Sequence, residues 1–223
     1  MITLLEVFHW SQLFQPQFYI EHGGLWLIMF VVFAETGLFA GFFLPGDSLL
    51  FVAGIYCGPL ASEIIQSNNE WVNLLVLFLF ISSAGILGNY VGYIFGKNVG
   101  PTMYDWKENL FFKKKYLLQA EEFYVKHGGR AIVIARFIPI LRTFAPIVAG
   151  IVQMDKRKFM YFNIVGCLGW VASMLSAGYF LQSWILNHFQ FDLKNHLEVI
   201  VLGIVLITTA PVIIKVITHK SAK

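Results

Sequence analysis

Residues 131–153 have the sequence AIVIARFIPILRTFAPIVAGIVQ, an apolar stretch that carries Arg136, Arg142, Pro139 and Pro146. As a helix, the part before Pro139 would be only about 12 Å long, far less than the ~30 Å hydrocarbon core of a bilayer. Proline removes a backbone donor, so we expect Pro139 and Pro146 to break the helix. The stretch therefore predicts a re-entrant hairpin that enters and leaves the membrane on one side.

A similar design occurs earlier in the chain, in residues 25–58. Here the break is expected at Pro45 and Gly46, within the sequence FLPGD, and the charged residues are Glu35 and Asp47. Both stretches place an F-x-P element ahead of an AGI tripeptide. Similar units in opposite orientation are the inverted-repeat plan of many secondary transporters. The sequence thus predicts two oppositely inserted hairpins.

The composition is that of a membrane protein. Of 223 residues, 57% are hydrophobic and only 13% are charged, whereas soluble domains carry about 25% charged residues. We expect an all-α polytopic protein with one membrane domain over residues 25–223. We expect residues 1–24 to form an interfacial or partly ordered N-terminal segment. Within the membrane domain, residues 97–130 are expected to form an amphipathic surface region, and the spans are expected at 72–96, 159–186 and 197–218.

The distribution of basic residues predicts the orientation of the chain. Residues 1–96 contain no Lys or Arg, and all sixteen basic residues lie from Lys97 onward. Because basic loops stay in the cytoplasm, we place residues 97–130 and the C-terminus there. The span 72–96 then begins outside, so the first hairpin opens outward and the second opens inward.

The charged residues of the hairpins predict a polar site within the membrane. A charge at the centre of a transmembrane helix costs roughly 2.5–3.5 kcal/mol and therefore faces a partner, a cavity or a substrate. Arg136 and Arg142 offer planar donor groups that suit a phosphate. Glu35 and Asp47 are candidates for proton coupling, because burial and nearby arginines both shift carboxyl pKa values. The alternative is that the four charges only pair and lock the hairpins together.

These residues resemble the DedA family of bacterial membrane proteins, also called the SNARE-associated or VTT-domain superfamily. The resemblance rests on the stretches ETG (35–37), FLPGDSLLF (43–51), GNYVGYIFG (88–96) and RFIPILR (136–142). It continues through Pro146, Ala149, Gly150, Asn163, Gly166 and Trp170. It implies a lipid-handling protein of the bacterial inner membrane, with essential acids at Glu35 and Asp47 and essential arginines at Arg136 and Arg142. Many members carry an acid at the position of Asn89, so coupling here must rely on the other acids or be weaker.

The leading interpretation is a proton-linked flippase for undecaprenyl phosphate or a related anionic lipid, with lipid and protons as its partners. The alternatives are an integral-membrane polyprenyl pyrophosphate phosphatase, a proton-coupled exporter of small solutes and a structural protein. The sequence shows no nucleophile, metal or cofactor motif, so we expect no enzyme activity, no cofactor and no nucleic-acid partner. A homo-oligomer remains compatible with the sequence.

Overall fold

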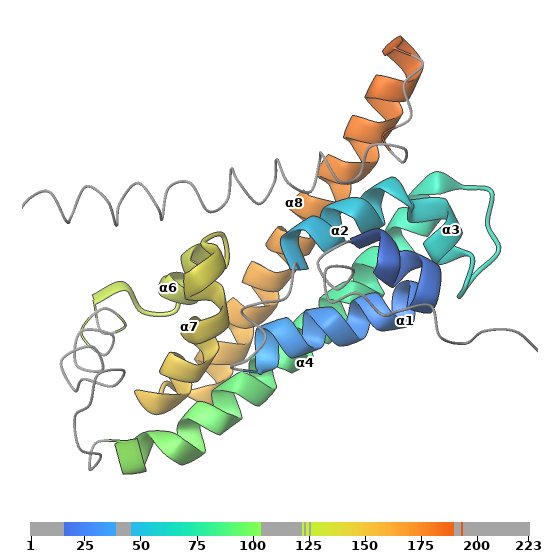
Figure 1. The fold of residues 1–223 in the computed structure, drawn as a ribbon. Helices are drawn as coiled ribbons and strands as arrows, with labels where there is room; N and C mark the ends of the chain where they lie inside the picture. Colours follow the sequence, from blue (N-terminus) through green and yellow to red (C-terminus); the bar gives the residue numbers. More distant parts are fainter. Residues whose placement is uncertain are drawn as a thin grey trace, which may run out of the picture. The chain divides into compact units, whose positions relative to one another are not determined.

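The structure is a computed structural model that describes residues 16–38, 46–103, 122, 124, 126–189 and 193 (Figure 1). All regular elements in these ranges are helices. In chain order they are α1 (Pro16–Gly37), α2 (Gly46–Ile55), α3 (Cys57–Ala61), α4 (Glu70–Met103), α6 (Arg130–Ala135), α7 (Pro139–Ile151) and α8 (Lys156–Phe189). The predicted all-α class agrees with these elements.

Helices α4 and α8 are the two long apolar helices of the described residues. Each has 34 residues and is therefore about 51 Å long. The stretches Glu70–Gly100 and Lys156–Phe189 are long and apolar enough to cross a membrane. They contain the predicted spans 72–96 and 159–186. The third predicted span, 197–218, lies outside the described residues, as do Pro45 and most of 97–130.

The chain divides into two compact units. Unit 1 combines Met1–Ile28, Leu44–Leu77 and Met174–Lys223, and unit 2 combines Met29–Phe43 and Phe78–Ser173. Helices α1, α4 and α8 each contribute residues to both units. The site predicted from the arginines belongs to unit 2, because Arg136, Arg142 and Glu35 all lie there.

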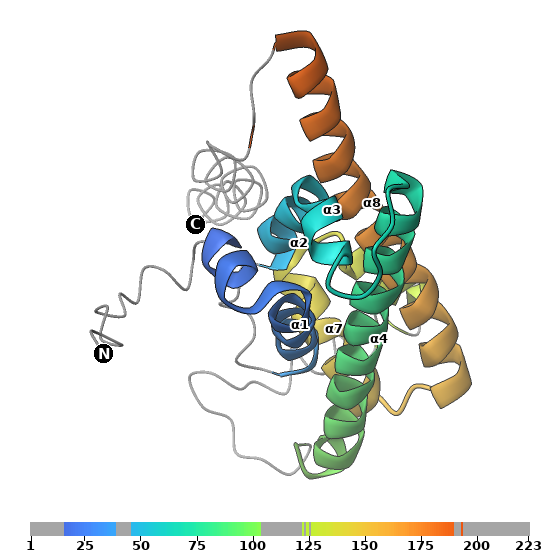
Figure 2. The ribbon, with the colours of Figure 1, turned by 90° about the vertical axis from the view of Figure 1, so that its right-hand side faces the viewer.

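In unit 2, α6 and α7 are two short helices joined by a break at residues 136–138. The break precedes Pro139, which begins α7 at a position where the missing N–H has no helical partner to lose. Helix α7 lies beside α4 (Figure 2), where Gly96 faces the carbonyl oxygen of Ile147 and Gly150 faces that of Tyr93. These glycines bring the two backbones close together.

The prediction that Pro146 breaks the hairpin is wrong. Pro146 lies inside α7, which continues to Ile151. A proline in a helix interior costs one hydrogen bond, but it does not end a helix whose surroundings hold it in place. The neighbours Ala145 and Ile147 are buried, so packing on both sides of the proline maintains the helix.

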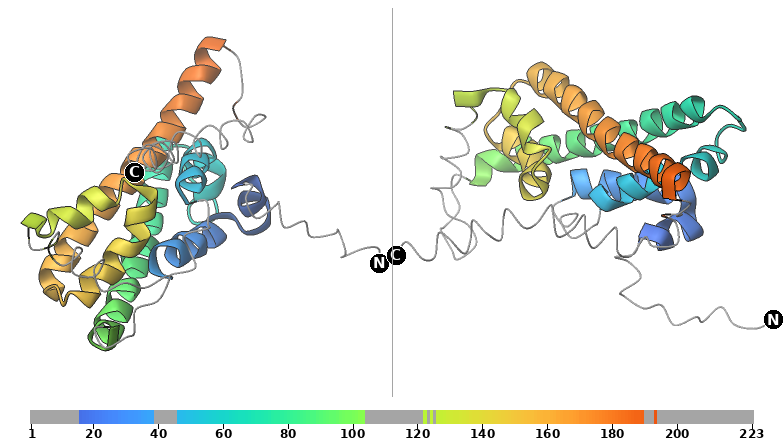
Figure 3. Two further views of the ribbon diagram at one scale, coloured as in Figure 1. Left: turned by 60° about the vertical axis from the view of Figure 1, so that its left-hand side comes forward. Right: turned by 90° about the horizontal axis from the view of Figure 1, so that it is seen from above.

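In unit 1, α2 and α3 lie next to the second half of α8 (Figure 3), with Gly54 against the carbonyl oxygen of Leu175. Helix α1 is kinked at Gly24, which has φ 52° and ψ −143°. The carboxylate of Glu63 accepts a hydrogen bond from the N–H of Leu25 at 3.1 Å. A carboxylate in this position satisfies one of the free donors at the start of the second part of α1.

Candidate functional site

A buried ion pair joins α7 to α1 in unit 2. Arg142, in the first turns of α7, donates from Nη2 to Oε1 of Glu35, near the end of α1. Arg142 is 8% exposed and Glu35 is 2% exposed. A pair so deeply buried loses its hydration, so each partner depends on the other for compensation of its charge. The structure thus brings together two of the four charged residues singled out by the sequence.

Arg136 lies at the break between α6 and α7, and it faces two asparagines. Its Nη1 donates to Oδ1 of Asn163 at 3.1 Å. With the carboxamide oxygen of Asn89 turned toward Arg136, that oxygen accepts from Nη2 at 3.0 Å and the amide nitrogen donates to the carbonyl of Thr36 at 3.2 Å. In the opposite orientation the amide nitrogen faces the guanidinium nitrogens, which are also donors, and donates to Oδ1 of Asn163 at 2.6 Å.

Asn163 connects Arg136 to the backbone of α4. Its Nδ2 donates to the carbonyl oxygen of Ile86 at 3.1 Å, while its Oδ1 accepts from Arg136. Asn163 is fully buried, and both ends of its carboxamide are therefore satisfied. The two asparagines hold the guanidinium of Arg136 through neutral acceptors, so its positive charge is not cancelled by them.

Trp170 of α8 lies against both arginines. The guanidinium carbon of Arg136 is 5.4 Å from the centroid of the indole ring, and that of Arg142 is 4.9 Å away. A cation within about 6 Å of an aromatic face is stabilised by the ring quadrupole. Because Trp170 is 1% exposed, the contact is shielded from water, where such interactions are strongest.

The described cluster has an excess of positive charge. Two arginines carry +2 and one glutamate carries −1, which leaves a formal +1 among Glu35, Arg136 and Arg142. A buried positive excess supported by neutral acceptors and an aromatic face attracts an anion. We call Glu35, Asn89, Arg136, Arg142, Asn163 and Trp170 the arginine cluster.

Close packing of α1 on α4 positions Glu35. A Cβ at Gly88 would run into Oγ1 of Thr36 and the carbonyl oxygen of Phe33, so only glycine permits this approach. The hydroxyl of Thr36 donates to the carbonyl oxygen of Val32 at 2.8 Å. The hydroxyl of Tyr124 donates to the carbonyl oxygen of Ala145 in α7 at 2.8 Å, and burial raises the pKa of this phenol.

The remaining predicted site residues lie at the starts of helices α2 and α7 or outside the described residues. Asp47 lies in the first turn of α2 in unit 1, where its side chain is half-buried. A carboxylate there is favoured by the positive end of the helix dipole. Gly46 begins α2, and Pro139 begins α7. Pro45 is not among the described residues.

The sequence did not predict the tryptophan of the cluster. Nor did it predict the partners of the two asparagines: Asn163 hydrogen-bonds both the backbone of Ile86 and the guanidinium of Arg136. The only signal for either asparagine was a polar amide within an apolar span. Trp170 was matched only as part of the family resemblance, because a tryptophan in a span is by itself equally compatible with a lipid-facing position.

The regular elements among the described residues are helices, two of them long and apolar enough to cross a membrane, and the comparisons with known proteins show a membrane protein. Residues 44–180 match the VTT domain. Protein DedA of Escherichia coli strain K12 is 38% identical over 202 residues, covering 89% of this chain and 86% of the relative. No solved structure matches the chain.

Two further relatives are named as membrane proteins. An uncharacterized membrane protein of Mycobacterium tuberculosis strain H37Rv is 36% identical over 187 residues, covering 84% of this chain and 76% of the relative. The inner membrane protein YqjA of Escherichia coli strain K12 is 34% identical over 162 residues, covering 71% of this chain and 68% of the relative. The chain therefore belongs to the DedA family of VTT-domain membrane proteins.

Proposed function

We propose that this protein is a proton-linked transporter that moves undecaprenyl phosphate or a related anionic lipid across the bilayer. The observation that carries this proposal is the arginine cluster, in which two buried guanidinium groups lie against one indole ring and Arg142 pairs with the buried carboxylate of Glu35. A lipid phosphate is the kind of anion that two neighbouring guanidinium groups bind. Its apolar tail remains in the hydrocarbon core while its headgroup contacts the arginines.

The geometry of the arginines supports recognition of a phosphate. Guanidinium groups bind phosphate through paired N–H donors in one plane. Asn163 and Asn89 accept from Arg136, which fixes the orientation of that guanidinium before a ligand arrives. In the proposed cycle, the phosphate replaces Glu35 as the partner of Arg142 and approaches Arg136 from the same side.

In this proposal, proton linkage arises because Glu35 and the lipid phosphate compete for Arg142. When Glu35 takes up a proton, its attraction to Arg142 falls, and the arginine becomes available to the phosphate. When Glu35 releases the proton, the ion pair forms again and the phosphate is displaced. In this proposal Asp47 is the second titratable group, in the first turn of α2.

The short helices support the proposed membrane arrangement. Helix α7 has 13 residues and α2 has 10, so each is about 20 Å long or less and is too short to span the bilayer. We propose that the α1–α2 and α6–α7 stretches are re-entrant hairpins of an inverted repeat, inserted from opposite faces. The protein would then be a multi-pass protein of the bacterial inner membrane with a cytoplasmic C-terminus.

The proposal is tested by measuring transbilayer movement of labelled undecaprenyl phosphate in liposomes that contain the purified protein. Wild-type protein is compared with Arg136→Ala/Arg142→Ala and with Arg130→Ala. Arg130 is an exposed arginine at the start of α6, so its variant is a control for loss of charge alone. We expect movement with wild-type and Arg130→Ala protein, none with the double variant, and a response to an imposed pH gradient.

Other outcomes distinguish the alternatives. Absence of lipid movement above that of empty liposomes, with folded protein, would refute the proposal for this lipid. Release of inorganic phosphate from a polyprenyl pyrophosphate would indicate a phosphatase. Movement of a small solute without lipid movement would indicate an exporter. Glu35→Gln is the test of coupling, and we expect it to reduce the response to the pH gradient.

A further inference from the structure

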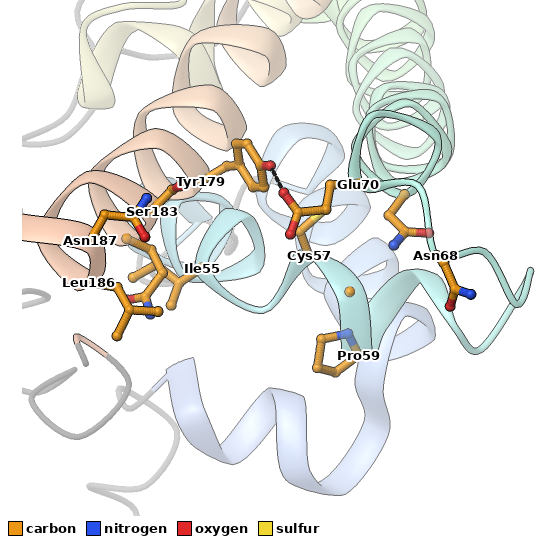
Figure 4. Close-up of a pocket in the computed structure, with 12 residues that line it drawn as sticks. Ile55, Cys57, Pro59, Asn68, Glu70, Tyr179, Ser183, Leu186 and Asn187 are labelled. Carbon is orange, nitrogen blue, oxygen red and sulfur yellow. Dashed lines mark hydrogen bonds between the residues drawn. The ribbon is translucent and has the colours of Figure 1, made fainter. Parts of the chain in front are cut away.

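Unit 1 contains a polar cavity of about 600 Å³ that takes no part in the arginine cluster (Figure 4). It lies between the α2–α3 junction, the start of α4 and the second half of α8. Its polar lining includes Glu70 and Asn73 from α4 and Tyr179, Ser183 and Asn187 from α8. Its volume is within the range of sites that bind small molecules.

The charge of this cavity is opposite to that of the arginine cluster. Glu70 is its one charged residue, and none of the described residues that line it is a lysine or an arginine. The hydroxyl of Tyr179 donates to Oε2 of Glu70, as the dashed line in Figure 4 marks. This hydrogen bond fixes the carboxylate at the cavity wall. A phosphate or carboxylate ligand would be repelled there.

Asn73 adds a hydrogen-bond acceptor that needs a donor. Its side chain is only 7% exposed, and its Nδ2 donates to the carbonyl oxygen of Ser67 at 3.2 Å. Its Oδ1 has no hydrogen-bond partner among the described residues. Buried polar atoms in proteins are almost always paired, so an unpaired one at a cavity wall points to a bound water or a ligand with a donor.

We infer that this cavity binds a small molecule that carries a protonated primary amine. An ammonium group has three donors and no acceptor, so it satisfies Oδ1 of Asn73 and neutralises Glu70 at the same time. The hydroxyl of Ser183 and the amide of Asn187 are available for hydroxyl groups on the ligand. The inference is independent of the proposed lipid phosphate, which requires the opposite charge.

The amine has two possible sources, a soluble amine or the amine headgroup of a lipid. The first experiment measures binding of radiolabelled ethanolamine to the purified full-length protein in phosphatidylcholine nanodiscs by equilibrium dialysis. Choline is the matched ligand without N–H donors. We expect choline to bind about tenfold more weakly, because a lost charge-assisted hydrogen bond has about that effect.

Two variants test the site. Glu70→Gln removes the charge but keeps an acceptor for Tyr179, and Asn73→Leu removes the unpaired acceptor. We expect each to weaken ethanolamine binding about tenfold. Glu122→Gln, at an exposed position in unit 2, is the control with the same change of charge and should bind normally. If Asn73→Leu fails to fold, the Glu70→Gln variant still decides the question, because Glu70 is exposed.

A further arm separates the two sources. Nanodiscs that contain phosphatidylethanolamine will reduce ethanolamine binding if a lipid headgroup enters the cavity, and will leave it unchanged if the ligand is soluble. Equal binding of ethanolamine and choline would overturn the inference. So would ethanolamine binding that Glu70→Gln leaves intact, or no binding at all, in which case water pairs with Asn73.

Discussion

The guanidinium of Arg142 binds the carboxylate of Glu35, a residue 107 positions earlier in the chain. This ion pair fastens α7 to α1 within unit 2, and both side chains are buried. The free-energy cost of removing one partner differs from the cost of removing both. Removal of one partner leaves an uncompensated buried charge, whereas removal of both leaves only a gap in packing. The asymmetry gives the first prediction.

Glu35→Gln or Arg142→Gln alone should destabilise the protein, and the double variant should be more stable than the two single effects predict. A broken buried pair costs about 3–5 kcal/mol, so each single variant should show a clearly lower melting temperature in detergent. The measurement is a double-mutant cycle of thermal unfolding. Additive effects would contradict the ion pair.

A transport assay of the double variant distinguishes a structural role of the ion pair from a role in lipid movement. If the pair served only to hold helices together, the stable double variant would retain lipid movement. We expect the double variant to lose movement despite its recovered stability, because no guanidinium remains at that position to bind a phosphate. The liposome assay described for the arginine variants measures this.

Asn163→Leu should impair transport while the protein remains folded. Leucine has a similar volume, but it removes the hydrogen bonds that Asn163 makes with Nη1 of Arg136 and with the carbonyl oxygen of Ile86. A lost hydrogen bond to a buried charged group costs about 1.5–3 kcal/mol, and the guanidinium of Arg136 is then held less firmly. Asn98→Leu is the control, because Asn98 is an exposed asparagine on α4. Equal activity of the two variants would show that Arg136 does not need Asn163.

Trp170→Leu should reduce lipid movement, because it removes a contact that both arginines make. The indole ring lies within 5.4 Å of both guanidinium carbons, and a shielded cation–π contact is worth about 2 kcal/mol. Trp170→Phe keeps an aromatic face, so we expect it to retain more lipid movement than Trp170→Leu. Melting temperatures of the two variants should be compared first. Identical activity at equal stability would refute the cation–π role.

Gly96→Ala should destabilise unit 2, whereas Gly169→Ala should not. A Cβ at Gly96 would run into the carbonyl oxygen of Ile147, and overpacking of this kind costs about 1–3 kcal/mol. A Cβ at Gly169 meets nothing within 4 Å, so alanine there gains up to about 1 kcal/mol from helix propensity. Opposite shifts of melting temperature are the expected result.

The pattern of the sequence predicted the helices that carry the site. The apolar stretches 72–96 and 159–186 lie within α4 and α8, and the break ahead of Pro139 separates α6 from α7. These features are local, because helix length and proline chemistry act within a few residues. The error at Pro146 has the same origin, since local chemistry does not include the packing that holds α7 together around it.

Arg136, Arg142 and Glu35 were also found from the sequence, because a charge in an apolar segment is conspicuous wherever it lies. Their ion-pair and hydrogen-bond partners were not found from the sequence. The sequence offered two acids for two arginines, and only the fold selected Glu35 for Arg142 and gave Arg136 two asparagines. Hydrogen-bond partners depend on which faces of distant helices meet, and glycine contacts such as that of Gly88 with Thr36 decide this.

The sequence by itself determined that this is a helical membrane protein with its basic residues confined to positions 97–223 and with charged residues inside its apolar stretches. Composition and proline positions are sufficient for that, since the bilayer admits few alternatives. Tertiary structure alone decided the excess positive charge of the arginine cluster, the place of Trp170 in it, and the acidic cavity around Glu70. Each of these joins residues far apart in the chain, and only packing brings such residues together.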